Sequence, residues 1–172
     1  MDVIEYNGKM YKRYDSKWCD ENTFVVHETL QCELNHEFIK TLDISSMSVR
    51  EMITEGDKFK KSASYDFAIK YYKEASVICD KKTMSYILPR LSSCYRNAHL
   101  PSKAIELLSS AKARFGKDII TEALLTSAAA AYCDMYEFEK AKKCCDIACS
   151  KAKGRVGYEL RLVYERIKKE TK

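Results

Sequence analysis

The strongest constraint on the fold is a pattern that occurs three times between residues 49 and 153. When Gly56, Ser92 and Ala129 are aligned, five columns keep one register, at steps of 36 and then 37 residues. The columns hold Gly56, Ser92, Ala129; Phe59, Tyr95, Tyr132; Ala68, Ala104, Ala141; Tyr72, Leu108, Cys145; and Ala75, Ala111, Ala148. Small residues let two helices approach closely, and the larger residues fill the space between them. Each copy is therefore predicted to be a pair of antiparallel helices.

This pattern resembles the tetratricopeptide repeat. The first copy reproduces that family's order of small, aromatic, alanine, aromatic and alanine residues at its usual internal spacing, with Gly56, Phe59, Ala68, Tyr72 and Ala75. The period is longer than the usual repeat of about 34 residues. The tryptophan expected early in each copy is replaced by Met52, Leu88 and Leu125, and the terminal proline by Asp80, Gly116 and Lys153. Because the spacing within each copy is kept, the extra residues are predicted to lie in the connections between copies.

The resemblance implies a mainly α fold, an α-α superhelix of tetratricopeptide type. The residues before the repeats predict a small N-terminal β-hairpin or meander. Residues 1–26 form the predicted meander: Asn7-Gly8 suits a type I′ turn between two β-prone runs, and a second turn at Asp15-Ser16 brings Trp18 back. Residues 23–26 could add another strand. Trp18 and several tyrosines are expected to hold this element together.

The helices that follow are predicted from apolar spacing. Residues 27–44 carry Leu30, Leu34, Phe38 and Leu42 every four positions, which gives one face of an amphipathic helix. Residues 47–153 hold the three helical hairpins, opened by a Ser48 to Glu51 capping box. Pro89 is expected near the beginning of the second copy's first helix. Residues 155–172 are predicted to form a C-terminal capping helix that covers the last hairpin.

Composition limits the class of protein. With only 5 Gly and 2 Pro and 46% hydrophobic residues among 172, the chain is expected to be folded and helical. No run approaches the roughly 20 apolar residues of a membrane span, and the N-terminus lacks the layout of a secretory signal, so a soluble cytoplasmic protein is expected. The eight cysteines are then read as reduced core thiols. The net charge of +5 falls short of the excess typical of dedicated nucleic-acid binders.

By resemblance, the first helix of each pair lines a concave surface that binds a peptide or partner protein. The implied lining is Arg50, Ile53, Asp57, Lys60, Lys61, Tyr86, Arg90, Ser93, Arg96, Asn97, Thr126 and Asp134, with Ala123 and Ala130 beside them. The first two copies give a basic stretch, which favours an acidic partner. The alternative is that these lysines only solvate an exposed helix face. A solenoid face can also pair with a second copy of the chain.

No pattern in the sequence indicates catalysis. A Gly-rich phosphate loop, a nucleotide fingerprint and a Ser-His-Asp set in a supporting motif are all missing, so a non-enzymatic adaptor without a cofactor is expected. Capture of a chaperone's terminal carboxylate, known in some members of the family, needs Lys, Asn and Arg side chains at positions that here hold Ile53, Asp57, Arg90, Ala123 and Ser127. Arg90 alone suits that role, so this mode is rejected.

The N-terminal element suggests an alternative function. Cys19, His27, Cys32 and His36 are four potential zinc ligands within eighteen residues, although their spacing matches no zinc pattern that chemistry justifies, and a packed thiol with surface imidazoles is the preferred interpretation. Surfaces that bind nucleic acid combine aromatic and basic side chains. Such an alternating run is present here, formed by Tyr6, Lys9, Tyr11, Lys12, Arg13, Tyr14 and Lys17. The alternative is therefore a nucleic-acid-associated or zinc-binding accessory protein, and co-purified nucleic acid or one bound zinc would favour it.

Overall fold

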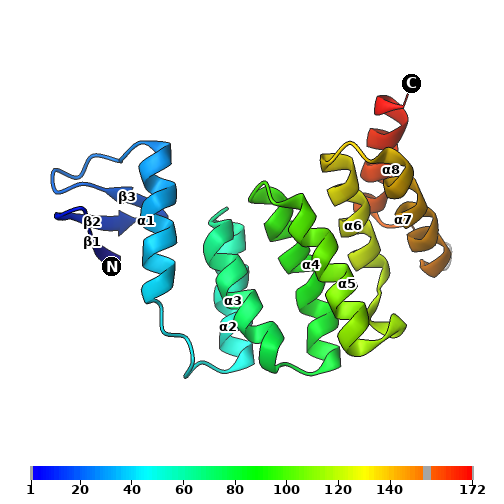
Figure 1. Cartoon of the computed structure of the whole chain (residues 1–172), viewed down its shortest axis with the longest axis horizontal. Helices are drawn as coiled ribbons and strands as arrows, with labels where there is room; N and C mark the ends of the chain where they lie inside the picture. Colours follow the sequence, from blue (N-terminus) through cyan, green and yellow to red (C-terminus); the bar gives the residue numbers. More distant parts are fainter. Residues whose placement is uncertain (1, 153–155, 172) are drawn as a thin grey trace. The chain divides into compact units, whose positions relative to one another are not determined.

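A computed structural model describes residues 2–152 and 156–171, so the outermost residues of the predicted segments 1–26, 47–153 and 155–172 lie outside the described chain. The protein is mostly helical, with a small antiparallel sheet at the N-terminus, which confirms the predicted fold class (Figure 1). The chain divides into two compact units, Met1–Glu74 and Ala75–Lys172, and the two are described in turn. The predicted segment boundaries differ from this division, which falls within one helix of the first repeat.

The sheet of unit 1 has three strands in the order β1-β2-β3, formed by Asp2–Tyr6, Lys9–Tyr14 and Lys17–Cys19. Both predicted turns are present: Asn7 and Gly8 have φ of 51° and 73°, as a type I′ turn requires. The further strand at residues 23–26 is reduced to one bridge between Cys19 and Val25. The cause is local, because the Asp20 carboxylate accepts hydrogen bonds from the backbone of Asn22 and Phe24 and bends the chain.

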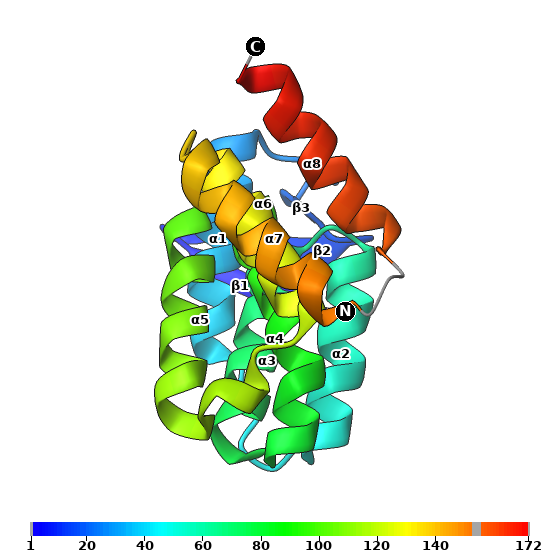
Figure 2. The same ribbon diagram turned by 90° about the vertical axis from the view of Figure 1, so that its right-hand side faces the viewer.

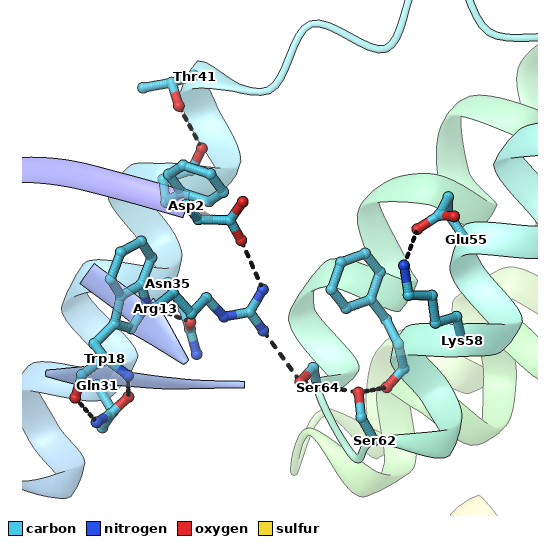
Figure 3. A network of polar contacts seen from close by, with 12 residues as sticks. Asp2, Arg13, Trp18, Gln31, Asn35, Thr41, Glu55, Lys58, Ser62 and Ser64 are labelled. Atoms are coloured by element: carbon cyan, nitrogen blue, oxygen red, sulfur yellow. Dashed lines mark hydrogen bonds and ion pairs between the residues drawn. The ribbon is translucent and has the colours of Figure 1, made fainter. Parts of the chain in front are cut away.

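Helix α1, Glu28–Thr41, packs against this sheet around Trp18, whose side chain is fully buried with Tyr11 and Leu34. The Gln31 amide accepts a hydrogen bond from the Trp18 backbone nitrogen and donates one to its carbonyl oxygen, both at 2.7 Å, and the indole nitrogen donates to Asn35 at 2.8 Å (Figure 3). The Trp18 ring also meets Phe38 edge to face at 5.2 Å. These contacts fasten β3 to α1.

The first repeat consists of α2, Val49–Lys61, and α3, Tyr65–Ile78. The predicted capping box is present: Ser48 accepts from the Glu51 backbone, and the Glu51 carboxylate accepts from the Ser48 backbone at 2.8 Å. Gly56 lies against Tyr72, because a Cβ atom at this glycine would be 2.8 Å from the ring. The small-residue column therefore has the steric role that the repeat pattern predicts.

Unit 2 contains the rest of the repeat array. Its elements are α4, Lys81–Asn97; α5, Pro101–Phe115; a 3₁₀ turn, Lys117–Ile119; α6, Glu122–Asp134; α7, Phe138–Lys151; and α8, Tyr158–Glu170. Helix α6 packs against α4 and α5 on one side and against α7 and α8 on the other (Figure 1; Figure 2 gives the view turned by 90°). The closing helix buries Leu160, Val163 and Ile167, as its apolar spacing predicts.

Two expectations about the second repeat were wrong. Pro89 lies inside α4, not near its beginning, because Asp80 caps the helix by accepting from the Thr83 backbone at 2.8 Å and α4 starts at Lys81. The extra residues between the first two copies accordingly extend α4 and do not lengthen a connection. The extra residues between the second and third copies do lie in the connection, where they form the 3₁₀ turn after Gly116.

Ser92 gives a first prediction about stability. Its side chain is fully buried in α4 and its hydroxyl has no hydrogen-bond partner. A buried hydroxyl without a partner costs about 1 to 3 kcal/mol relative to an apolar group of similar size. We therefore expect Ser92→Ala to raise the free energy of unfolding by about 1 kcal/mol, measured by urea denaturation followed by circular dichroism. Ser93→Ala, at the half-buried neighbouring residue, is the control. The prediction would be contradicted if Ser92→Ala changed the free energy of unfolding no more than Ser93→Ala does, or lowered it.

Candidate binding surfaces

In unit 1 the predicted lining residues lie on α2. Arg50 and Lys61 are exposed, and Ile53, Asp57 and Lys60 are partly buried. Asp57 accepts a hydrogen bond from the Tyr72 hydroxyl at 2.5 Å, so this carboxylate also ties α2 to α3. Among the exposed residues of this helix, Arg50, Lys58 and Lys61 are basic and Glu51 is acidic.

In unit 2 the predicted residues Tyr86, Arg90, Ser93 and Asn97 recur at intervals of three or four along one side of α4. Tyr86 is 43% exposed, and the Arg90 guanidinium lies over its ring at 3.4 Å while donating to the Tyr86 carbonyl at 3.1 Å. One turn further, the Asn97 amide donates to the Ser93 carbonyl at 2.9 Å. Arg90 is thus held flat on an aromatic ring.

The charge of α4 is of one sign. The helix carries Lys81, Lys82, Arg90 and Arg96 and no acidic residue. The nearest acidic group in sequence is the N-cap Asp80. A row of exposed aromatic and basic side chains without counter-charges on its own helix attracts anionic groups, most strongly at low ionic strength.

Arg96 and Asp134 meet in a network that joins three helices. The Arg96 Nε atom donates to one oxygen of Asp134 at 2.7 Å, and Arg166 of α8 donates to the other oxygen at 2.5 Å and to the Cys133 carbonyl at 3.0 Å. The carboxylate side chain is 25% exposed. Asp134 raises the pKa of Arg166, chiefly through this hydrogen bond. These two predicted lining residues therefore hold α4, α6 and α8 together, and the network keeps one excess positive charge.

Thr126 differs from the other predicted lining residues because it is only 5% exposed. Its hydroxyl donates to the Glu122 carbonyl one turn earlier, at 3.0 Å. Ala130 on the same helix is also buried, and Ala123 is exposed. Helix α6 is enclosed by its neighbours, so it can offer a partner little more than its first turn and Asp134.

Fewer of the tyrosines and basic residues of the N-terminal sheet are exposed than the sequence suggests. Tyr11 is 7% exposed and Arg13 is 8% exposed, and both belong to the interior of unit 1. The Tyr6 hydroxyl donates to Glu33 at 3.2 Å. The exposed members of the alternating run are Lys9, Lys12, Tyr14 and Lys17.

The four potential zinc ligands do not converge. Cys19 is buried at the end of β3, and His27 caps α1 through Nδ1, which accepts from the Leu30 backbone at 3.3 Å. Cys32 and His36 are exposed on α1. Within residues 2–152 and 156–171, no three His, Cys, Asp or Glu side chains are grouped closely enough to hold a metal ion.

The buried cysteines have the properties of core thiols. Burial is the main cause that raises the pKa of Cys145 to about 12, and burial likewise raises the pKa values of Cys133 and Cys144. A thiol with a raised pKa is a poor nucleophile and a poor metal ligand near neutral pH. This arrangement suits packing and disfavours thiolate chemistry.

A cavity that sequence reasoning missed lies in unit 1, with a volume of about 400 Å³. Its walls come from the β1 and β2 strands, the turn after β2, and α1 to α3, and its lining includes Arg13, four aromatic rings and the charged residues Asp2, Asp15, Glu55 and Lys58. The alternation of tyrosines and basic residues identifies β2 as a candidate binding element in the sequence, but it does not show that the Arg13 side chain lines a cavity. The cavity depends on contacts between distant segments, such as the hydrogen bond from Arg13 to Ser64, 51 residues away.

A second cavity of about 350 Å³ lies near the start of α1, between Lys9 to Tyr11 and the loop at residues 20–22. Its lining holds His27, which is already engaged as the helix cap. In the part of the chain that the structure describes, no helix is long and apolar enough to cross a membrane.

Comparisons with known proteins agree with the observed architecture. No family model and no curated protein matches the chain. Among solved structures, the TPR domain of Sgt2 from Aspergillus fumigatus superposes with a TM-score of 0.62 and 17% sequence identity, over 73% of this chain and 80% of that one. At this identity the likeness concerns the fold alone, which is similar to that of a tetratricopeptide-repeat domain.

Proposed function

We propose that this protein is a non-enzymatic interaction module, an adaptor that binds a peptide segment of a partner protein along the exposed side of α4 next to α6. The observation that carries the proposal is the row of Tyr86, Arg90, Ser93 and Asn97 on a helix of tetratricopeptide type. Arg90 is fixed over the Tyr86 ring, so little side-chain entropy remains to be lost when a partner binds.

The proposed partner is acidic. Helix α4 has four basic residues and no acidic one; two of the four are paired with carboxylates of other elements, Arg96 with Asp134 and Lys81 with Asp118. Glutamate or aspartate side chains of a partner would meet guanidinium and ammonium groups without competing carboxylates on the same helix. The likeness to the Sgt2 TPR domain supports the general class of interaction module and leaves the partner's identity open.

The test compares charge reversal on this face with charge reversal elsewhere on unit 2. Lys82→Glu with Arg90→Glu changes α4, and Lys112→Glu with Lys142→Glu makes the same change in net charge at exposed positions of α5 and α7. The probes are two short fluorescent peptides, one alternating Glu with Ala and the other Lys with Ala. Fluorescence anisotropy at low and at physiological salt measures both affinities.

We expect the acidic peptide to bind more tightly than the basic one, the α4 variant to lose about tenfold or more in affinity, and added salt to weaken binding. Equal binding of the two peptides would remove the argument from charge. An equal loss in the control variant would show that net charge, and not the α4 face, attracts the peptide. A pull-down with the native chain and both variants then shows whether a natural partner uses the same helix.

The alternative function, nucleic-acid or zinc binding through the N-terminal sheet, has less support. Tyr11 and Arg13 are buried, so two of the residues that would stack on bases or contact phosphates face the interior. Base stacking needs an accessible ring face. A normal ratio of absorbance at 260 and 280 nm after purification without nuclease is the expected result, and co-purified nucleic acid would favour the alternative.

A further inference from the structure

Arg13 occupies an unusual position for an arginine. Its side chain is only 5% exposed, and its guanidinium lies 4.0 Å above the Phe67 ring and 5.4 Å from that of Phe59. One terminal nitrogen donates to Asp2 at 3.4 Å and the other to the Ser64 hydroxyl at 3.2 Å (Figure 3). The Nε atom is buried and has no hydrogen-bond partner.

These contacts leave the guanidinium poorly satisfied. The distance to Asp2 is long for a charge-assisted hydrogen bond, which is usually about 2.7 to 2.9 Å. Burial lowers the pKa of Arg13, and Asp2 opposes this effect. A buried donor without an acceptor carries a cost that a better placed oxygen atom would remove. The site therefore favours a ligand that brings such an acceptor.

The walls of the adjoining cavity are aromatic. Phe59 stacks on Phe67 at 5.0 Å and on Tyr71 at 5.5 Å between ring centres, and Phe38 lies 6.1 Å from Phe67. A volume of about 400 Å³ falls within the range of small-molecule and side-chain pockets, roughly 300 to 1,000 Å³. An aromatic side chain inserted here would replace water by ring contacts.

The charges around the cavity exclude strongly charged ligands. Asp2, Asp15 and Glu55 would repel an anion, and the Lys58 ammonium at the rim is already paired with Glu55 at 3.3 Å. The buried Arg13 guanidinium would repel a cation that entered as deeply as the rings. An uncharged group with a polar acceptor fits both conditions.

We propose that the cavity of unit 1 binds an uncharged aromatic residue of a partner peptide, with the ring against Phe59 and Tyr71 and the peptide carbonyl accepting a hydrogen bond from the Arg13 guanidinium. This site is separate from the α4 face and does not rest on the function proposed for it. It selects for an aromatic ring and against charge, whereas the α4 face selects for acidic residues.

The test uses three small probes that share a phenyl ring and differ in charge: N-acetylphenylalaninamide is neutral, N-acetylphenylalanine is an anion, and phenethylamine is a cation. Nitrogen-15 and carbon-13 NMR spectra of the full chain follow the Arg13 Nε–H resonance and the ring resonances of Phe59 during titration to millimolar concentration. We expect the neutral amide to move both signals and to bind at least about threefold more tightly than either charged probe.

Arg13→Met keeps an unbranched side chain over Phe67 but removes the hydrogen-bond donors. We expect this variant to bind the neutral probe with about tenfold lower affinity than the native chain. Lys12→Met is the matched control, because Lys12 is an exposed lysine next to Arg13 on β2 and does not line the cavity; we expect it to change the affinity by less than about twofold. No shift of the Arg13 and Phe59 signals with the neutral probe would overturn the proposal. Preferential binding of the cationic probe would show that the carboxylates of the cavity select the ligand, and would overturn the proposal. The proposal would also be overturned if the neutral probe bound Arg13→Met as tightly as the native chain, because the guanidinium would then serve only for packing. If Arg13→Met fails to fold, the three titrations of the native chain decide alone.

Discussion

Trp18→Ala is expected to lower the free energy of unfolding of unit 1 by about 3 to 5 kcal/mol, the largest effect of a single substitution that we predict. The Trp18 side chain is fully buried, meets Phe38 edge to face, and donates from its indole nitrogen to Asn35. Alanine would leave a cavity between β3 and α1 and would leave the Asn35 oxygen without its donor. Because the free energy of a domain is typically only about 5 to 15 kcal/mol, a loss of this size brings unit 1 close to unfolding.

Urea denaturation followed by circular dichroism measures the loss, and amide hydrogen exchange locates it. Trp18→Phe keeps a ring against Phe38 but removes the indole donor and part of the buried ring volume, so we expect a smaller loss of about 1 to 2 kcal/mol. Phe24→Ala is the control, because Phe24 is an aromatic residue in the same part of the chain that is 71% exposed. Equal effects of Trp18→Ala and Phe24→Ala would show that the sheet does not depend on this core.

Gly56→Val is expected to cost about 2 to 3 kcal/mol, because a Cβ atom at residue 56 would lie 2.8 Å from the Tyr72 ring. The ring cannot retreat freely: Tyr72 is fully buried and its hydroxyl donates to Asp57. Valine adds two more methyl groups behind the first contact. The gain in helix propensity over glycine offsets only a part of the strain.

A double-mutant cycle tests whether this contact has the physical cause that we assign to it. The repeat columns pair glycine with tyrosine in the first copy, serine with leucine in the second, and alanine with cysteine in the third, so the smallest first residue accompanies the largest second one. We expect Gly56→Ala and Tyr72→Leu to be less destabilising together than the sum of the two single changes, by about 1 kcal/mol. Strict additivity in urea denaturation would contradict the proposed steric coupling.

The secondary structure and the pairing of helices could be predicted because their causes are local. The five repeat columns mark where paired helices touch, and the residues in them are buried or partly buried in all three copies. The Asn7-Gly8 turn and the Ser48 to Glu51 capping box depend on a few neighbouring residues. Pro89 misled the prediction because a proline at a helix start and one inside a helix look alike when a stronger cap, Asp80, lies upstream.

The candidate surfaces were predictable only in part. Repeat spacing places Tyr86, Arg90 and Asn97 on one side of a helix, and the structure leaves that side accessible. The same spacing places Thr126 in an equivalent row, but the neighbouring helices cover it. Which helix of a repeat array is enclosed depends on all its neighbours, and a pattern within one helix does not contain that information.

The sequence by itself determined that the chain forms repeated helical pairs after a small sheet, because the spacing of small and aromatic residues along a helix decides which residues can face a partner helix. Only the tertiary structure decided the role of Arg13, which is joined to Ser64 across 51 residues, and the junction of Arg96 and Arg166 at Asp134. The physical reason is that a side chain's charge state, partners and accessibility are set by the groups that folding brings around it, and those groups are distant in the sequence.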